Sequence, residues 1–234
     1  MPSMVNFTNK FNIVKNKIKK IIDTSSKEEQ IEKFGSYWQD KDDNFYNDIY
    51  NETPKIHEFF KDWYATQKNI QTILDVGCGS GIYGRTILDD KSYFGIDISK
   101  KAIEIAKNND KNKMHDYIAC DFIADDILND KKFDLVFSLS VIDHVYDPDK
   151  FLKKCINLSN RYVLIVAYWG YFPNLGSHNI DWHPETTCYQ NQLSIMQIQN
   201  LLNHMKLKYS IDSLSYEKRG KPAKATIIII EKNQ

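Results

Sequence analysis

The stretch Ile73-Leu74-Asp75-Val76-Gly77-Cys78-Gly79-Ser80-Gly81-Ile82-Tyr83-Gly84 decides the fold. Its apolar start predicts a buried strand over Thr72–Val76, and three glycines at alternate positions, Gly77, Gly79 and Gly81, follow that strand directly. A helical pattern comes next. A strand that enters a helix through glycines lets bare backbone approach a ligand and turns helix N–H groups toward it. The stretch therefore predicts a ligand-binding loop.

From this loop onward, short apolar runs alternate with amphipathic segments, which is typical of βαβ units and a mostly parallel sheet. Strands are expected at Thr72–Val76, Tyr93–Asp97, Tyr117–Cys120, Phe133–Leu139 and Tyr162–Ala167. Helices are expected near Ile82–Leu88, Lys100–Asn108, Asp125–Asn129 and Asp149–Leu158. The short joint Gly220-Lys221-Pro222 between Leu207–Tyr216 and Thr226–Glu231 predicts an antiparallel C-terminal hairpin. The fold class is therefore α/β, with seven strands.

The N-terminal third is expected to be helical. Phe11, Val14, Ile18, Ile21 and Ile22 recur at helical spacing among lysines, which indicates a basic amphipathic surface helix. Thr53-Pro54 predicts the start of a further helix. We expect residues 1–69 to form a helical lid or appendage and residues 70–234 the main domain, within one globular unit.

Composition excludes several classes of protein. The 234 residues carry 31 Lys and Arg against 31 Asp and Glu, so no net charge recruits nucleic acid or an anionic membrane. The longest uncharged apolar stretch, Tyr162–Phe172, is too short to span a bilayer. Without a visible export signal, a cytoplasmic location is expected. The four cysteines form no CxxC pair, which favours reduced thiols.

Three strand ends indicate which ligand the loop holds. Gly79–Gly84 also fits the dinucleotide pattern GxGxxG, but the carboxylate of Asp75 would repel a pyrophosphate and suits an ammonium and a sulfonium. Asp97 can accept the ribose hydroxyls of a dinucleotide or of a ligand that carries an ammonium and a sulfonium, so it does not distinguish the two. Asp121 followed by Phe122 can address an adenine amino group and cover the base. These carboxylates share the carboxyl edge of the sheet, where open α/β sheets bind ligands.

The segments ILDVGCGSG (73–81), YFGIDIS (93–99), ACDF (119–122) and FDLVFSLSVIDHVYDP (133–148) together resemble the class I S-adenosylmethionine-dependent methyltransferases. The resemblance extends from about Ile70 to Ala167 and is to the small-molecule branch related to quinone-biosynthesis enzymes. It implies a Rossmann-like, doubly wound sheet and S-adenosylmethionine as cofactor. Ordinary helix capping by the three aspartates is the alternative.

The resemblance also implies a role for each cofactor residue. The methionine part is expected at Asp75 and along the backbone of Gly77, Cys78, Gly79 and Gly81. The ribose and adenine are expected at Asp97, Ile98, Asp121 and Phe122, with Ser138 or Leu139 near the ribose or sulfonium.

The methyl acceptor is expected on the other side of the cofactor. Methyl transfer is an in-line displacement that needs alignment, a base when the acceptor is a hydroxyl, and no metal. His144 after the fourth strand is the candidate base, with packing or capping as its alternative role. Candidate substrate residues are Tyr37 and Trp38 near the N-terminus and His178, Asp181, Trp182, His183 and Tyr189 in the long loop after the fifth strand. The spacing of the loop histidines matches no familiar metal signature, so no metal is predicted.

The leading hypothesis is a methyltransferase that O-methylates a polar small molecule or biosynthetic intermediate. N-methylation of a small amine and a catalytically silent S-adenosylmethionine-binding protein are the alternatives. Ser138-Leu139-Ser140 stands where nucleic-acid amine methyltransferases carry Asn-Pro-Pro-Tyr, and the net charge is zero, so no nucleic-acid partner and no integral membrane contact are expected. The sequence leaves the oligomeric state open.

Overall fold

The computed structural model describes residues 26–128, 130–218 and 220–232, and the chain divides into two compact units between Phe34 and Gly35. The first unit contributes helix α2, Lys27–Lys33, to the described residues. Ser26 Oγ accepts the N–H of Glu29 at 3.2 Å, and Glu29 Oε2 accepts the N–H of Ser26 at 2.9 Å, which forms a capping box. The basic helix expected at residues 11–22 lies outside the described residues, and the domain boundary expected at residue 69 remains a prediction.

The second unit holds one large sheet and the remaining described elements. The strands are β1 (Thr72–Val76), β2 (Ser92–Asp97), β3 (His115–Ala119), β4 (Phe133–Leu139), β5 (Ser159–Ala167), β6 (Trp182–His183), β7 (Cys188–Tyr189), β8 (Lys208–Lys218) and β9 (Lys221–Glu231). The α-helices are α3 (Asp43–Glu52), α4 (Pro54–Thr66), α5 (Ile82–Thr86), α6 (Lys100–Asn109), α7 (Pro148–Leu158) and α8 (Ile195–His204), and the 3-10 helices are η1 (Ser36–Asp40) and η2 (Ile142–His144).

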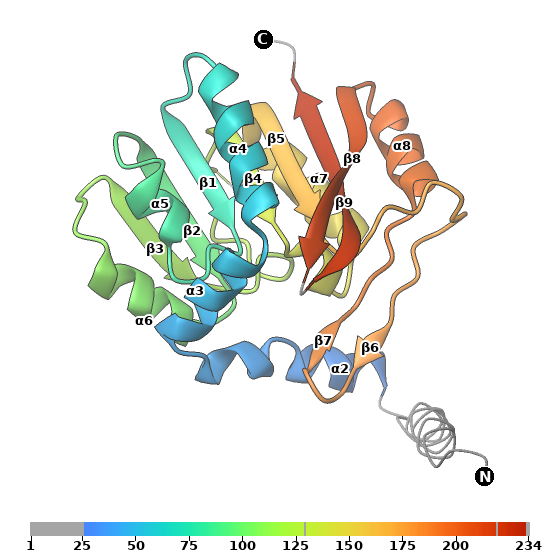
Figure 1. The fold of residues 1–234 in the computed structure, drawn as a ribbon, viewed down its shortest axis with the longest axis horizontal. Coiled ribbons are helices and arrows are strands. Elements are labelled where there is room, and N and C mark those ends of the chain that lie inside the picture. Colours follow the sequence, from blue (N-terminus) through green and yellow to red (C-terminus); the bar gives the residue numbers. More distant parts are fainter. Residues whose placement is uncertain (1–25, 129, 219, 233–234) are drawn as a thin grey trace. The chain divides into compact units, whose positions relative to one another are not determined.

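The large sheet has seven strands in the order β3-β2-β1-β4-β5-β9-β8 (Figure 1). β1 pairs in parallel with both β2 and β4, so the strand order reverses beside β1. β9 runs antiparallel between β5 and β8. This arrangement confirms the predicted doubly wound, mostly parallel sheet with an antiparallel C-terminal hairpin. The reversal beside β1 is the place where such sheets bind ligands.

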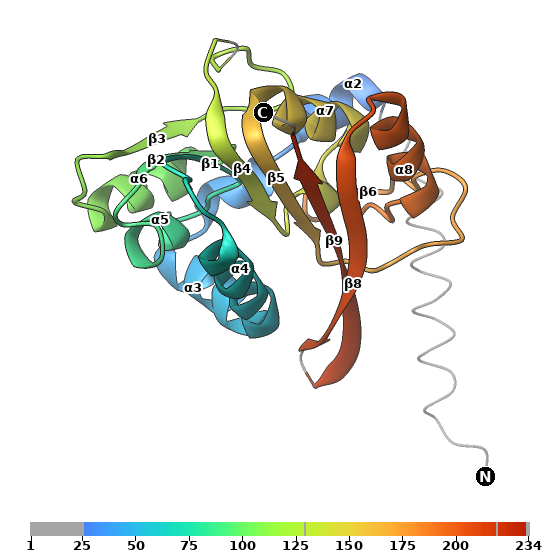
Figure 2. The same cartoon turned by 90° about the horizontal axis from the view of Figure 1, so that it is seen from above.

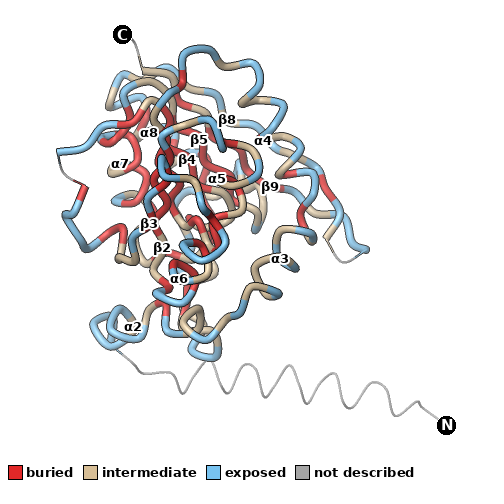
Figure 3. Tube along the Cα trace, turned by 90° about the vertical axis from the view of Figure 1, so that its left-hand side faces the viewer, coloured by how far each residue is buried: buried red, intermediate tan, exposed pale blue. Residues whose placement is uncertain are grey.

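Helices cover both faces of the sheet. Helices α4, α5 and α6 lie on one side, and α7 and α8 lie on the other (Figure 2). The central strands β1, β4 and β5 are largely buried (Figure 3), and β5 is buried at every position from Val163 to Ala167. A continuous apolar run of this kind is typical of a strand covered on both faces. Every helix within the described ranges is too short or too polar to cross a bilayer, and the cytoplasmic location remains a prediction.

Helix starts follow the sequence signals. Ser99 Oγ accepts the N–H of Ala102 at 3.1 Å and starts α6, and Asp147 accepts the N–H of Lys150 at 2.9 Å and starts α7. The helix expected at Asp125–Asn129 is wrong, because Asp125 and Asp126 have no regular structure and Ile127 and Leu128 lie in a turn. Oδ2 of Asp125 accepts the N–H of Asp121, and Oδ1 of Asp121 accepts the N–H of Ile123; such carboxylate-to-backbone bonds stabilise turns in place of a helix.

Candidate functional site

The glycine loop between β1 and α5 lies at the carboxyl edge of the sheet. Gly77, Gly79 and Gly81 all have left-handed backbone conformations, with φ of +82°, +53° and +75°. A Cβ at Gly77 would lie 2.2 Å from Cγ2 of Val141, and one at Gly81 would lie 2.8 Å from Cε1 of Tyr117. Both distances are too short for a side chain. The loop therefore depends on glycine for its conformation and for its close packing.

Strand β2 holds this loop in place. The N–H groups of Gly77 and Cys78 both donate to the carbonyl of Ile96, at 2.8 and 2.9 Å. The N–H of Gly79 donates to Asp97 Oδ2 at 2.9 Å, and the N–H of Ser99 donates to Asp97 Oδ1 at 2.8 Å. Burial raises the pKa of Asp97 above its usual value, although these N–H groups favour the carboxylate. The backbone N–H groups of Gly79, Ser99 and Ile98 thus all favour the charged form of Asp97.

Asp75 lies deeper than Asp97. Its side chain is buried, and its Oδ2 accepts the hydroxyl of Tyr93 at 2.6 Å. Burial raises the pKa of Asp75 to about 8, against the lowering effect of that hydrogen bond. At neutral pH the carboxyl group is therefore largely protonated until a cationic group approaches it.

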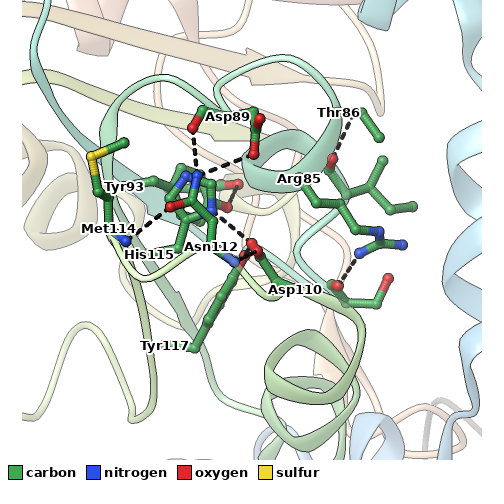
Figure 4. Close-up of polar contacts among 12 residues, drawn as sticks. Arg85, Thr86, Asp89, Tyr93, Asp110, Asn112, Met114, His115 and Tyr117 are labelled. Atoms are coloured by element: carbon green, nitrogen blue, oxygen red, sulfur yellow. Dashed lines mark hydrogen bonds and ion pairs between the residues drawn. The ribbon is translucent and has the colours of Figure 1, made fainter.

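A polar cluster behind the loop supports Tyr93. Figure 4 shows Asp110 meeting Tyr117 and His115 beside Tyr93. Nδ1 of His115 lies 2.6 Å from Oδ2 of Asp110, and the hydroxyl of Tyr117 donates to the same oxygen. Arg85 in the same view donates to the carbonyl of Ser80. The hydrogen bond to Asp110 thus holds the ring of Tyr117 in the position where it limits the space at Gly81.

Asp121 and Phe122 are both engaged within the protein. Oδ1 of Asp121 accepts the N–H of Ile123 at 2.8 Å, and its Oδ2 accepts the hydroxyl of Tyr146 at 3.2 Å. The ring of Phe122 is 8% exposed and packs edge-on against Phe151 of α7, with 5.1 Å between centroids. The structure thus places both residues at the expected edge, and their contact with an adenine remains a prediction.

The other predicted cofactor residues differ in accessibility. Ser138 is fully buried and donates to the carbonyl of Val76 at 2.7 Å, which ties β4 to β1. Leu139 is half-buried against the core. Ile98 is also half-buried, and a Cβ at Gly35 would lie 2.6 Å from its Cδ1. The segment that leads into η1 therefore passes directly over Ile98.

Helix η1 carries the predicted aromatic residues Tyr37 and Trp38. The carbonyl of Trp38 accepts the hydroxyl of Ser99 at 2.7 Å, and the N–H of Tyr37 donates to Thr187 Oγ1 at 2.9 Å. The ring of Trp38 lies 5.9 Å from the ring of His144, centroid to centroid. The structure therefore brings Trp38 to the candidate base and attaches η1 both to the cofactor edge and to the long loop.

The two ring nitrogens of His144 are both hydrogen bonded. Nδ1 lies 2.8 Å from the carbonyl oxygen of Tyr189, and Nε2 lies 3.1 Å from the hydroxyl of Tyr168. A carbonyl oxygen only accepts, so Nδ1 carries the proton. Burial lowers the pKa of His144, which favours the neutral ring with its lone pair on Nε2.

Two buried residues that the sequence reasoning missed hold η2 and His144 in position. Asp143 is 1% exposed and accepts the N–H of Tyr168 at 2.9 Å and that of Trp169 at 3.3 Å. Asn191 is fully buried, and its Nδ2 donates to the carbonyls of Ile142 at 3.2 Å and Val145 at 2.7 Å. Two sequence features could have indicated Asp143: it directly precedes His144 in the fourth motif, and its partner Tyr168 directly follows β5.

The predicted substrate residues of the long loop separate into two groups. His178 lies away from His144: its Nδ1 accepts the N–H of Ser194 at 2.8 Å and its Nε2 lies 3.3 Å from Asp149 Oδ1. Ser194 Oγ accepts the N–H of Gln197 and caps the start of α8. The side-chain amide of Gln197 donates to Asp149 and accepts the N–H of His178. His178 therefore attaches the loop to α7 and α8.

The second group forms the β6–β7 hairpin. Trp182 and Tyr189 pair across it with centroids 5.0 Å apart, and Nε2 of His183 lies 3.6 Å from Oδ2 of Asp181. The carbonyl of Tyr189 and Sγ of Cys188, both in β7, lie 2.8 and 3.9 Å from Nδ1 of His144, which places this hairpin beside the candidate base. Among the residues that the structure describes, no three His, Cys, Asp or Glu side chains are grouped as metal ligands.

Comparison with known families identifies this arrangement. The family model for a methyltransferase domain matches residues 67–217, which is more than half of the chain. The chain belongs to the class I S-adenosylmethionine-dependent methyltransferases. Membership of this family makes S-adenosylmethionine the cosubstrate of the methyltransferase and confirms the resemblance seen in the four sequence motifs.

Relatives of this methyltransferase are distant. It is 39% identical over 98 residues to a ubiquinone biosynthesis O-methyltransferase of Pelagibacter ubique, covering 40% of this chain and 39% of that protein. It is 30% identical over 137 residues to the enzyme of the same name from Chromobacterium violaceum, covering 55% and 57%. The methyltransferase thus aligns with about two fifths to three fifths of the length of these relatives.

Solved structures share the fold at low sequence identity. The magnesium protoporphyrin IX methyltransferase of Synechocystis PCC 6803, with bound S-adenosylhomocysteine, has a TM-score of 0.57 at 16% identity and covers 87% of this chain and 94% of its own. A 1,6-didemethyltoxoflavin-N1-methyltransferase of Burkholderia thailandensis has a TM-score of 0.60 at 13% identity, with coverage of 82% and 84%. This likeness confirms the fold of the methyltransferase.

Proposed function

We propose that this methyltransferase transfers a methyl group to a hydroxyl of a small polar molecule, with His144 as the source of basicity. The observation that carries the proposal is the hydrogen bonding of His144, whose Nδ1–H faces the carbonyl of Tyr189 and leaves Nε2 as the basic atom. A neutral imidazole of this kind serves a hydroxyl acceptor, which must lose its proton during attack. The relatives named for ubiquinone biosynthesis O-methylation support the same assignment.

The residues present fit S-adenosylmethionine. A Cβ at Gly77, Gly79 or Gly81 would lie 3.0 Å or less from Val141, Tyr46 or Tyr117, so the loop keeps its backbone bare. Asp97 accepts the N–H of Gly79, and Asp75 lies in β1 just before the loop. When bound, S-adenosylmethionine supplies a methyl carbon that its sulfonium activates. We assign its ammonium to Asp75 and the loop backbone and its ribose hydroxyls to the carboxylate of Asp97.

The remaining contacts follow from position along the sheet edge. We assign the adenine to the surface between Ile98, Asp121 and Phe122. Ser138 and Leu139 stabilise the end of β4, which lies beneath the sulfonium in this assignment. Trp38, and Trp182 with Tyr189 in the hairpin, wall the acceptor side. In-line transfer to a hydroxyl requires alignment and a proton acceptor, and this proposal calls for no metal.

Binding of the cosubstrate is tested by calorimetry with S-adenosylmethionine and S-adenosylhomocysteine. Asp97→Asn removes the charge that receives two ribose hydroxyls, at about 1.5–3 kcal/mol for each charged hydrogen bond, so Kd should rise by about 10²-fold or more. Asp134→Asn is the matched control. Asp134 also accepts two backbone N–H groups, those of Gln71 and Thr72, but at the opposite edge of the sheet, so its variant should bind normally.

The acceptor class is tested with a radiolabelled methyl donor and a panel of phenols and catechols matched by amines of the same skeleton. O-methylation predicts labelled ethers and a rate that falls when His144 is protonated at low pH. Transfer to the amines alone would replace this proposal with N-methylation, because a neutral amine attacks without a base. Tight cosubstrate binding with no transfer to either series would support a catalytically silent binding protein.

A further inference from the structure

His144 has no free lone pair in this structure. Its Nδ1–H donates to the carbonyl of Tyr189, and its Nε2 accepts the hydroxyl of Tyr168. A neutral imidazole has a single basic lone pair. An acceptor hydroxyl can therefore reach Nε2 directly only if Tyr168 moves aside.

Tyr168 is fixed on several sides. Its N–H donates to the buried carboxyl group of Asp143 at 2.9 Å, and its carbonyl accepts the hydroxyl of Tyr216 at 2.8 Å. Nζ of Lys218 lies 4.0 Å from the centroid of its ring, and the ring of Trp169 packs edge-on at 5.7 Å. Both the backbone and the ring are held, so a swing of the ring away from His144 would break several contacts at once.

We propose that Tyr168 is a catalytic residue that carries the proton of the acceptor hydroxyl to Nε2 of His144. This inference rests on the proposed O-methylation. The tyrosine oxygen donates its one proton to His144 and keeps lone pairs that can accept the acceptor O–H. The hydrogen-bonded chain then runs from the acceptor through Tyr168 and His144 to the carbonyl of Tyr189.

The two proton transfers and the methyl transfer occur in a single concerted step. The acceptor O–H proton passes to the oxygen of Tyr168 while the phenolic proton of Tyr168 passes to Nε2 of His144. The acceptor oxygen forms its bond to the methyl carbon, and the carbon–sulfur bond breaks with its electron pair left on sulfur. Tyr168 ends as a neutral phenol and His144 as an imidazolium whose Nδ1–H still faces Tyr189. Solvent then removes the extra proton of His144.

The groups around His144 favour its neutral ring, so the imidazolium formed during transfer is short-lived. Tyr168 comes from the end of β5, Cys188 Sγ of β7 lies 3.9 Å from Nδ1, and the ring of Trp38 covers one side. Burial, and after it the charge of Lys218, lowers the pKa of His144, so the ring returns its proton readily after each turnover. Direct ionisation of Tyr168 is opposed, because burial and the charge of Asp143 raise its pKa.

The first test reads the tautomer without any acceptor. In the ¹⁵N-labelled full chain, long-range ¹H–¹⁵N spectra should show His144 protonated at Nδ1 and bare at Nε2. Tyr168→Phe should move the Nε2 resonance and leave the proton on Nδ1, since Tyr189 still accepts it. A proton on Nε2 in the unmodified protein would overturn the relay.

The second test uses catechol and 4-nitrocatechol, whose more acidic hydroxyl is ionised near neutral pH. Tyr168→Phe and His144→Asn should each slow methylation of catechol by about 10²–10⁴-fold, the usual contribution of general-base catalysis. The double variant should lose no more than either single variant, because both residues act in one chain. Methylation of 4-nitrocatechol should fall much less, since its proton has already left.

Control and contrary outcomes are distinct. Tyr209→Phe removes a hydroxyl from the outer part of β8, where it donates to Asn203, and should leave both rates unchanged. If the unmodified enzyme methylates catechol and the Tyr168→Phe variant does so at the same rate, the relay is wrong but the proposed O-methylation still holds. An unmodified enzyme that methylates amines but no hydroxyl would overturn the proposed function and the relay with it.

Discussion

The substitution Gly77→Ala tests whether the conformation of the glycine loop is as constrained as the structure indicates. Gly77 has φ of +82°, and a Cβ there would lie 2.2 Å from Cγ2 and 3.0 Å from Cγ1 of Val141. A left-handed backbone costs an L-residue about 1–2 kcal/mol. Forcing a methyl group against a stiff β-branched side chain adds about 1–3 kcal/mol. The free energy of unfolding should therefore fall by about 2–5 kcal/mol.

Two further variants separate these contributions. Gly220 has φ of +73°, but a Cβ there would meet nothing within 4 Å, so Gly220→Ala should cost only the backbone share of about 1–2 kcal/mol. Val141→Ala removes both Cγ atoms and leaves Cβ of Val141 at 3.1 Å from the new methyl group. The double variant Gly77→Ala/Val141→Ala should then be more stable than the sum of the single variants predicts, by about 1–3 kcal/mol.

Urea unfolding followed by far-UV circular dichroism measures these differences as shifts of the midpoint at constant m-value. Calorimetry with S-adenosylhomocysteine on the same proteins should show weaker binding for Gly77→Ala and unchanged binding for Gly220→Ala. The reasoning fails if Gly77→Ala and Gly220→Ala differ by less than about 0.5 kcal/mol, or if Val141→Ala shows no coupling to Gly77→Ala.

Further predictions concern three buried polar side chains. Burial raises the pKa of Asp75 to about 8, so binding of an ammonium beside it at pH 7 should release a proton. Calorimetry in two buffers of different ionisation enthalpy should detect this release, and the Asp75→Asn variant should not show it. Because this folded pKa exceeds the unfolded value of about 3.9, Asp75 should also make the ligand-free protein less stable as pH rises from about 4 to 8, a slope that Asp75→Asn removes. His178→Ala should lower stability by about 1–3 kcal/mol and leave the KM of the acceptor unchanged; a raised KM at constant Tm would make His178 a substrate residue. Asn191→Ala removes the donor to the carbonyls of Ile142 and Val145, so the free energy of unfolding measured in urea should fall by about 2–4 kcal/mol. A loss of less than about 1 kcal/mol would contradict this prediction.

The cofactor half of the molecule could be predicted because its information is local. Thr72–Val76 and Phe133–Leu139 were predicted with the bounds that the structure shows, since buried parallel strands consist of apolar runs that end sharply at a glycine or polar residue. Asp97 lies two residues before the helix cap Ser99 and accepts its N–H within one turn. These features depend on residues within one strand–turn–helix unit, whereas the bond from the Gly79 N–H to Asp97 also requires β2 to pair with β1.

The acceptor half could not be predicted in the same way, because its contacts join residues that are far apart in the chain. His144 meets Tyr168 and Tyr189, which are 24 and 45 positions further on, and Asn191 reaches back 49 positions to Ile142. No periodicity encodes such pairs. His178 illustrates the consequence: its residue type suggested the site, whereas its two ring nitrogens bind the loop to α7 and α8.

Helix η1 joins the two halves and constrains how the acceptor side can vary. The Trp38 carbonyl accepts the hydroxyl of Ser99 at the cofactor edge, and the Tyr37 N–H donates to Thr187 at the end of the β6–β7 hairpin. The ring of Trp38 also faces His144. A change in the hairpin that alters the acceptor pocket would therefore act through η1 on Ile98 and Ser99. We therefore expect a substitution at Thr187 to disturb the segment over Ile98 as well as the hairpin, because Thr187 Oγ1 accepts the N–H of Tyr37 in η1.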